Sequence, residues 1–215
     1  MKHIIANLKS NKNPHEIQTW MKELQKFSFI AALPYPFLAL VPKDRKFELA
    51  IQDISPFPAG AYTGAVTARN LDGFGVQYAI VGHSERRRYF YETNQDVANK
   101  VTMCVEAGIT PIVCVTRDEV EAQANSIADA ERKKCIVVFE PVEHIGTGTT
   151  DTLEHILKIR ARVRTAFGDV PFLYGGSVDT KSDTELLLHK GIDGFLVGSA
   201  SLDAGEFSKL ISVFN

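Results

Sequence analysis

Eight short apolar runs recur along this chain and dominate its pattern of hydrophobic and polar positions. They are rich in β-branched and aromatic residues and lack a clean polar–apolar alternation, which is typical of strands buried on both faces of a parallel sheet. The runs are Ile4–Leu8, Phe29–Leu33, Leu49–Ile54, Gln77–Val81, Thr110–Val115, Cys135–Phe139, Val170–Tyr174 and Gly194–Val197.

Helical patterns separate these runs. In the segment His15–Lys26 apolar residues recur at helical spacings, and Asn13-Pro14 before it is a start signal for a helix. Similar patterns predict five further segments, of which the last two are short: Asn94–Ala107, Asp151–Phe167, Asp179–His189, Tyr35–Val41 and Thr67–Leu71.

Strands that alternate with helices indicate the α/β class. Eight strands in 215 residues leave about 27 residues per unit, which fits a closed (β/α)8 barrel near the short end of the range for that fold. An open doubly wound sheet is the alternative, but the GxGxxG turn typical of that fold does not follow the first strand. No Ser- or Pro-rich linker interrupts the chain, so we expect residues 1–215 to form one domain.

Composition narrows the class of partner. With 45% hydrophobic residues and a net charge of −2, the chain lacks the basic footprint of a nucleic-acid-binding protein. No apolar run is long enough to span a membrane, and the apolar part of the N-terminus is too short for a signal peptide. The three cysteines lie outside any CxxC motif and favour a reducing compartment, with buried thiols expected at Cys114 and Cys135. We therefore expect a cytoplasmic protein.

In a (β/α)8 barrel the site lies at the carboxyl ends of the strands. Asn7 and Lys9 end the first run and point the same way, so Lys9 either meets an anion or reaches past the strand into water. His83 follows the fourth run at the start of a helix, where the helix dipole disfavours the imidazolium. A neutral imidazole there can polarise a carbonyl, and the alternative is a capping or core histidine.

The sixth run ends at Glu140, which is followed by a glycine-rich loop as far as Thr150. This pattern suggests a general base beneath a lid, although a surface turn with an incidental acid would look the same. The seventh and eighth runs are each followed by small residues before a helix start, at Gly175-Gly176-Ser177 and Gly198-Ser199-Ala200. Exposed N–H groups there form an anion site, and these are the two strands after which such barrels often bind phosphate.

A base, an imidazole, a cation and a phosphate cradle suit proton abstraction next to a carbonyl of a small phosphorylated substrate. This chemistry requires no cofactor. The sequence has no cluster of His, Cys and carboxylate residues at metal-ligand spacing, so we expect neither a metal nor a cofactor.

Five motifs between Asn7 and Leu202 resemble those of the triosephosphate isomerase family: Asn-x-Lys, GHSERR, EPV-x-x-IGTG, YGGSV and DGFLVG-x-ASL, in this order. The resemblance implies a TIM barrel without a cofactor. It also implies the interconversion of dihydroxyacetone phosphate and glyceraldehyde 3-phosphate through an enediolate, a step of glycolysis and gluconeogenesis.

The resemblance also implies roles for single residues. Glu140 would be the base and His83 the neutral electrophile. Lys9 would be the cation beside the substrate oxygens, with Asn7 as its polar partner. Ser84 would hold the resting Glu140, and Glu85 would orient Lys9. Phosphate would be held by main-chain N–H groups of four residues: Gly146, Ser177, Gly198 and Ser199.

The chain departs from the family at the hinge of the lid. Glu143 stands where the family usually has Trp, and Thr116-Arg117 stands where it usually has Gly-Glu. The two hinge positions therefore carry opposite charges, and we expect either a replacement salt bridge between Arg117 and Glu143 or independent drift with both side chains in water. Thr149-Thr150 replaces the usual Lys-Thr at the other hinge, and Ser199 replaces a glycine.

A further departure concerns assembly. The segment Ser55–Val66 resembles the long third loop of the family, which inserts into the partner subunit of a dimer and would bring Thr63 near the other active site. Ala65 replaces the usual Glu, which removes an expected cross-subunit partner for Arg86. We expect a homodimer, weakened by this loss.

Two rival functions share much of this pattern. One is a sugar-phosphate isomerase for larger substrates, which a lid this short disfavours. The other is a binding protein that has kept the barrel and lost turnover. The altered hinge leaves this function open, and so does the short fifth helix expected between Val115 and Val138.

Overall fold

Eight parallel strands close into a barrel in the computed structural model, which describes residues 2–142, 150–180, 182, 186 and 188–214. Each strand pairs with the next, and β1 pairs with β8, so the described sheet has no free edge. The strands are β1 (His3–Asn7), β2 (Ile30–Leu33), β3 (Glu48–Ile51), β4 (Val76–Val81), β5 (Thr110–Val115), β6 (Ile136–Phe139), β7 (Phe172–Tyr174) and β8 (Gly194–Val197). The predicted (β/α)8 barrel is confirmed.

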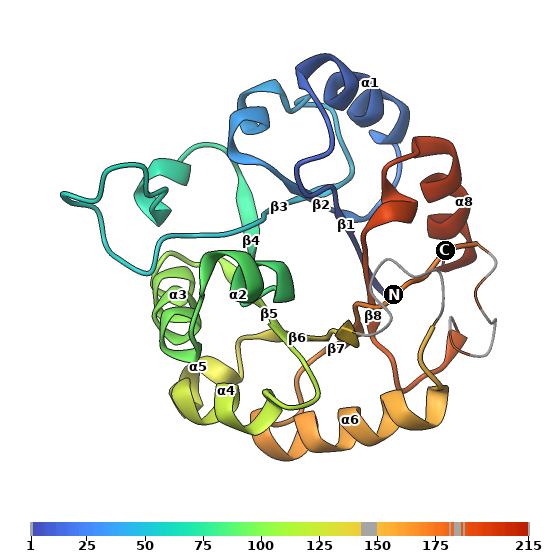
Figure 1. Cartoon of the computed structure of the whole chain (residues 1–215). Helices are drawn as coiled ribbons and strands as arrows, with labels where there is room; N and C mark the ends of the chain where they lie inside the picture. The colour runs from blue at the N-terminus through green and yellow to red at the C-terminus, as the bar shows by residue number, and fades with distance from the viewer. Residues whose placement is uncertain (1, 143–149, 181, 183–185, 187, 215) are drawn as a thin grey trace.

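Helices form an outer ring around this barrel (Figure 1). They are α1 (Pro14–Leu24), η1 (Tyr35–Leu40), η2 (Ala68–Leu71), α2 (Ser84–Phe90), α3 (Asn94–Glu106), α4 (Val120–Ser126), α5 (Asp129–Arg132), α6 (Leu153–Phe167), η4 (Ser199–Ser201) and α8 (Ala204–Phe214). The helix predicted over Asp179–His189 includes residues 181, 183–185 and 187, which lie outside the described residues.

The start of α1 shows how a local signal locates a helix. The side chain of Asn13 accepts hydrogen bonds from the N–H groups of His15 and Glu16, and the Glu16 carboxylate accepts from the N–H of Asn13. Pro14 occupies the first turn, where no N–H is needed. The Asn-Pro pair therefore determines both where the helix begins and how its first N–H groups are satisfied.

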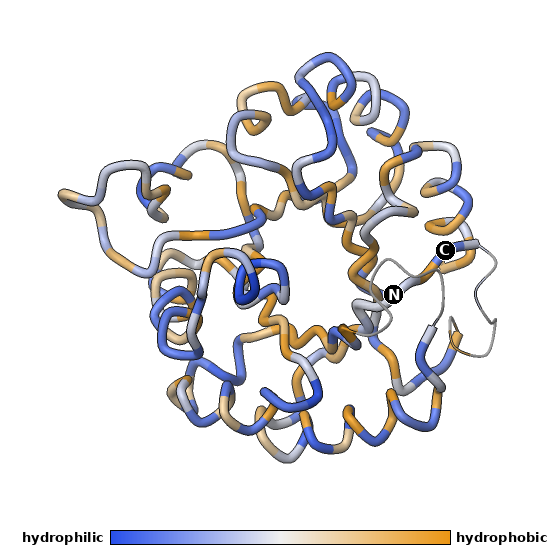
Figure 2. Tube along the Cα trace, in the orientation of Figure 1, coloured by the Kyte–Doolittle hydropathy of each residue, from blue (hydrophilic) through white to orange (hydrophobic). Residues whose placement is uncertain are grey.

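Two apolar layers explain why the strands showed no clean alternation. One fills the barrel, and the other lies between strands and helices, so consecutive residues are both buried. The strands of the barrel are accordingly mostly apolar (Figure 2). The inner layer consists of Ile5, Ile30, Ala32, Ala50, Tyr78, Ile80, Ile112, Cys114, Ile136, Val138, Leu173 and Leu196.

Parity along the strands places polar side chains just above this inner layer. Ile5 points into the barrel, and Asn7 is the next inward position of β1. Val138 points inward in the same way, and Glu140 follows it beyond the end of β6. The carboxyl end of the barrel therefore carries the polar groups.

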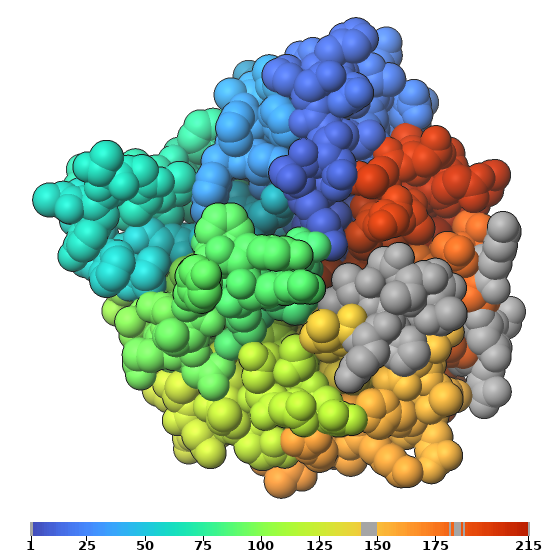
Figure 3. All heavy atoms as spheres, viewed as in Figure 1, coloured from blue at the N-terminus to red at the C-terminus, as the bar shows by residue number. Residues whose placement is uncertain are grey.

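The segment between β3 and β4 extends away from the barrel at the left of Figure 1 and forms a separate lobe in Figure 3. Its neck is closed by a 2.8 Å hydrogen bond from the N–H of Ser55 to the carbonyl of Val66. Within it the rings of Phe57 and Tyr62 stack with centroids 4.5 Å apart. The predicted Ser55–Val66 loop is thus a protruding arm.

Three smaller observations complete the fold. The predicted fifth helix is divided into the short helices α4 and α5. Cys104, Cys114 and Cys135 are free and buried, as expected for the last two. Within the described part of the chain, no helix has the length and apolar character needed to cross a bilayer.

Candidate active site

Glu140 directly follows β6 at the carboxyl end of the barrel, with 1% of its surface exposed. Its Oε1 lies 3.0 Å from Nε2 of His83, and its Oε2 accepts a 2.7 Å hydrogen bond from the N–H of Ser84. Burial by itself raises the pKa of the Glu140 carboxyl, but His83 and the hydrogen bonds from Ser84 outweigh burial and hold the pKa below its ordinary value. The side chain is therefore a carboxylate.

Gly175 allows the turn after β7 to approach this carboxylate. Its N–H donates a 2.8 Å hydrogen bond to the carbonyl of Phe139. A Cβ at this position would lie 2.7 Å from Cγ1 of Val138 and 3.3 Å from Cγ of Glu140. Only glycine fits here, so the first glycine of the turn is required by close packing.

His83 caps the start of α2. Its Nδ1 accepts a 3.2 Å hydrogen bond from the N–H of Glu85, and a ring nitrogen can accept only when it carries no proton. The proton of the neutral imidazole therefore lies on Nε2, facing Glu140. Burial lowers the pKa of His83, and the Glu140 carboxylate raises it by more while the two side chains stay in contact.

Lys9 adopts a left-handed backbone conformation, with a φ of 51° that is unusual for a residue other than glycine. Its N–H donates to Oδ1 of Asn7 at 3.2 Å, and its carbonyl accepts from the side-chain amide of Gln52 at 3.0 Å. Its Nζ lies 2.5 Å from Oε1 of Glu85. The structure therefore brings Asn7, Lys9 and Glu85 together, with the ammonium group at the barrel mouth.

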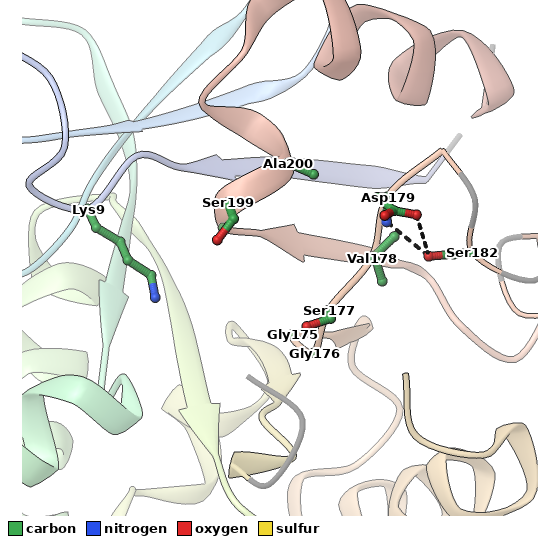
Figure 4. Close-up of a pocket in the computed structure, with 10 residues that line it drawn as sticks. Lys9, Gly175, Gly176, Ser177, Val178, Asp179, Ser182, Ser199 and Ala200 are labelled. Carbon is green, nitrogen blue, oxygen red and sulfur yellow. Dashed lines mark hydrogen bonds between the residues drawn. The ribbon is translucent and has the colours of Figure 1, made fainter. Parts of the chain in front are cut away.

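A hollow of about 260 Å³ opens between Lys9 and the turns that follow β7 and β8. Figure 4 shows Lys9 on one side of it and Ser199 and the Gly175–Ser177 turn on the other. Its lining also includes Gly198, and a Cβ on that glycine would lie 3.7 Å from Cε of Lys9. Ser177, Gly198 and Ser199 are thus gathered around one concave site beside a cation.

The turn after β8 is fixed from two directions. The N–H and the hydroxyl of Ser201 both donate to the carbonyl of Gly198, at 2.9 and 2.7 Å. The indole N–H of Trp20 in α1 donates to the carbonyl of Ser201 at 2.8 Å. Among the described residues only Lys9 and Tyr91 combine a side chain with positive φ, so Ser199 tolerates its side chain without left-handed strain.

Two sequence expectations fall outside the described residues. Gly146, expected to donate an N–H to phosphate, and Glu143, expected at the lid hinge, belong to the segment 143–149. The guanidinium of Arg117 contacts its neighbour Asp118, with Nε 3.2 Å from Oδ1, and both side chains are largely exposed. The pairing of Arg117 with Glu143 stays a prediction.

Sequence reasoning missed several supporting residues. Gln52 holds the carbonyl of Lys9, Trp20 holds the turn after β8, and the hydroxyl of Tyr174 accepts a 2.9 Å hydrogen bond from the N–H of Asp151. Tyr174 stood within a recognised motif, but the other two had no local signal because their partners are distant in sequence. Within the described ranges no three His, Cys, Asp or Glu side chains gather as metal ligands would.

The fold and this arrangement define a class of protein. The chain forms a closed (β/α)8 barrel. Its charged and polar side chains converge at the carboxyl ends of the strands, beside the turns after β7 and β8. This is the architecture of the (β/α)8-barrel enzymes.

Comparison with known proteins identifies the family within this class. The family model described as triosephosphate isomerase matches residues 2–214. A triosephosphate isomerase of Mesomycoplasma hyorhinis is 39% identical over an alignment that covers 98% of this chain and 97% of that protein. One of Thermus thermophilus is 35% identical with the same coverage, and one of Herminiimonas arsenicoxydans is 40% identical over 83% of each chain. The chain belongs to the triosephosphate isomerase family.

Proposed function

We propose that this protein interconverts dihydroxyacetone phosphate and D-glyceraldehyde 3-phosphate, a step of glycolysis and gluconeogenesis. The family assignment and the names of the relatives support this reaction. The observation that carries the mechanism is the buried Glu140 carboxylate, held against His83 at the mouth of the barrel. A base so placed can remove a proton next to a carbonyl.

The proposed reaction moves one proton between two carbons. Glu140 removes a proton from the hydroxyl-bearing carbon next to the carbonyl. The electron pair of that C–H bond forms a C=C bond, and the π pair of the carbonyl moves onto its oxygen. Nε2–H of His83 and the ammonium group of Lys9 stabilise the resulting enediolate. Glu140 then returns the proton to the neighbouring carbon, and proton exchange between the two oxygens completes the aldose or ketose.

Asn7, Ser84 and Glu85 have supporting roles in this proposal. Asn7 fixes the backbone of Lys9, and Glu85 orients its ammonium group, as their hydrogen bonds to Lys9 support. The Ser84 N–H holds Glu140 in the resting position, which Glu140 must leave to reach substrate. Once Glu140 moves away, His83 loses the carboxylate that raises its pKa, and its buried imidazole reacts as the neutral form.

The phosphate group is proposed to lie in the hollow beside Lys9. Ser177, Gly198 and Ser199 line that hollow, and their small side chains let an anion approach the main chain. Gly146 is proposed to add a fourth N–H by resemblance to the family. Inorganic phosphate should therefore act as a competitive inhibitor, and a purely noncompetitive effect would contradict this placement.

Exchange of the base tests the mechanism. Glu140→Gln keeps the size of the side chain, but the amide cannot act as a base. Turnover of glyceraldehyde 3-phosphate should therefore fall about 10²- to 10⁴-fold in a coupled assay. Glu154→Gln is the matched control, because Glu154 is an exposed glutamate of α6 that pairs only with Lys158 among the contacts found for it. Turnover by Glu140→Gln near that of the control would refute the proposal.

We further propose a homodimer in which the arm Ser55–Val66 enters the partner subunit. A cavity of about 300 Å³ next to His83 and Lys9 supports this proposal, because the arm of the partner subunit could dock there. Phe90, which also lines the cavity, is 66% exposed. With Ala65 in the arm, the guanidinium of Arg86 contacts its own chain, 2.7 Å from Asp53 and 2.9 Å from Glu92.

Light scattering at micromolar concentration tests this assembly. The expected result is twice the chain mass of 23.8 kDa, and a monomer would refute the proposal. The proposed location is the cytoplasm, and the three free cysteines support a reducing compartment.

A further inference from the structure

Four charged side chains form a closed ring beside the barrel mouth. The guanidinium of Arg86 contacts Asp53 at 2.7 Å and Glu92 at 2.9 Å. The ammonium group of Lys100 contacts the same two carboxylates, Asp53 at 2.6 Å and Glu92 at 3.1 Å. Each charge thus touches both charges of opposite sign, and the ring as a whole is neutral.

The ring joins distant parts of the chain at a partly buried site. Asp53 follows β3, whereas the other three members belong to α2, α3 and the turn between them. Glu92 and Lys100 are buried, and the side chains of Asp53 and Arg86 are only partly exposed. Charges in such a place are stable only as a balanced set, because loss of one partner leaves an uncompensated buried charge.

The ring is hydrogen-bonded to the turn that carries His83. Oε1 of Glu92 accepts the N–H of Gly82 at 3.2 Å, and the carbonyl of Gly82 accepts from Nε of Arg87 at 2.8 Å. Gly82 has a φ of 73° and directly precedes His83. The two peptide groups that flank Gly82 are therefore each held by a side chain, and one of these side chains, Glu92, is a member of the ring.

We propose that Asp53 is a positioning residue that fixes His83 through this ring, from within the same chain. Without the Asp53 carboxylate, Arg86 and Lys100 would share Glu92 as their only partner in the ring. Two cations competing for one carboxylate draw it away from the N–H of Gly82, and the turn relaxes. The inference rests on the proposed isomerase function, in which His83 contacts the substrate carbonyl.

Asp53 also has a place in the chain that suits this role. Its neighbour Gln52 donates from one side-chain amide to the carbonyl groups of Lys9 and Ala32, both at 3.0 Å. Two consecutive residues after β3 thus support two parts of the mouth, one through the backbone of Lys9 and the other through the ring.

Asp53→Asn tests the proposal, because it removes the charge and keeps the shape. We expect kcat to fall roughly 10- to 100-fold, since small misplacement of a reacting group is costly, while KM changes less than about twofold because phosphate is held at the far side of the mouth. The ¹⁵N resonances of the His83 imidazole should shift, with His83→Gln used to assign them. Val163→Ala, which truncates a buried residue of α6 far from the ring, controls for simple destabilisation and should leave kcat and these resonances unchanged.

A double variant tests the charge balance directly. Asp53→Asn with Lys100→Met restores a neutral set, Arg86 with Glu92, and should recover kcat to within about threefold of the unaltered protein. It also keeps the test valid if Asp53→Asn alone does not fold. A double variant that folds with kcat more than about tenfold below the unaltered protein overturns the proposal, as does an Asp53→Asn variant with normal kcat or with a change confined to KM.

The unaltered protein separates this proposal from the one on which it rests. If it does not turn over glyceraldehyde 3-phosphate, the proposed function fails. If it is active and the Asp53 variants behave otherwise than expected, only the positioning role fails.

Discussion

Substitution of Gly82 by alanine perturbs the active-site turn at its most constrained point. The residue has a φ of 73°, in the left-handed region. A Cβ there would lie 2.8 Å from Nη2 of Arg87, 3.1 Å from the carbonyl oxygen of Cys114 and 3.1 Å from Cγ2 of Val97. The change therefore combines backbone strain with steric overlap in a packed region.

Gly108 makes it possible to separate the two effects. Its φ is 72°, nearly that of Gly82, but a Cβ would meet no atom within 4 Å. Left-handed strain costs about 1–2 kcal/mol at either position, less the stabilisation of about 0.4–1 kcal/mol from a stiffer unfolded chain. Overpacking adds about 1–3 kcal/mol at Gly82 alone. The difference in unfolding free energy between the two variants should therefore be about 1–3 kcal/mol.

Urea unfolding and thermal melting at one protein concentration measure this difference. At about 2–4 °C per kcal/mol for a chain of this size, Gly82→Ala should melt roughly 2–12 °C below Gly108→Ala. Gly82→Ala should also lower kcat because His83 follows it, whereas Gly108→Ala should leave kcat unchanged. Equal melting temperatures, or a normal kcat for Gly82→Ala, would show that the turn yields without strain and that the reasoning is wrong.

Three further substitutions have outcomes that follow from single contacts. Tyr91 ends α2 with a φ of 56° and is 85% exposed, so Tyr91→Asn should raise the melting temperature by up to about 2–4 °C, and a lower value would contradict the strain argument. The pKa of Glu140 is lowered in the folded protein, so its carboxylate stabilises the fold at pH values above 4.5, the ordinary pKa of Glu, and this stability is lost as the pH falls through the folded-state pKa. His83→Gln removes one cause of the lowered pKa. It should therefore move acid unfolding, followed by circular dichroism, to higher pH. An unchanged pH midpoint of acid unfolding would mean that His83 does not lower the pKa of Glu140. Tyr174→Phe leaves the N–H of Asp151 without its acceptor and should cost about 1–3 kcal/mol in urea unfolding, whereas a neutral change would show that water replaces the hydroxyl.

Local signals predicted the barrel and much of its mouth. The Asn13-Pro14 pair located the start of α1 to within one residue, because a capping box is satisfied by neighbours in sequence. Strand parity predicted that Asn7 and Lys9 point the same way. β1 ends at Asn7 and Lys9 has a positive φ, so parity does not apply to Lys9, yet both residues line one cavity beside His83. These features depend on residues a few positions apart, so the sequence alone reveals them.

Long-range electrostatics escaped prediction. Asp53 and Lys100 are 47 positions apart, and nothing near either residue indicates that they meet. Arg86 was expected to lack its partner because Ala65 replaces an acid, yet a carboxylate of the same chain lies against it. Such a compensation becomes visible only when the barrel brings β3 next to α2 and α3.

Closure of the barrel between β1 and β8 has a consequence for folding kinetics. Ala6 pairs with Val197 across this seam, and the next residues on either side lead to Lys9 and to the Gly198-Ser199 turn. The two sides of the hollow beside Lys9 thus come together only when the strands most distant in sequence have met, a contact of high sequence separation that forms slowly. In a refolding experiment, the circular dichroism of the helices should return early. Enzyme activity should return later, at the rate at which β1 pairs with β8.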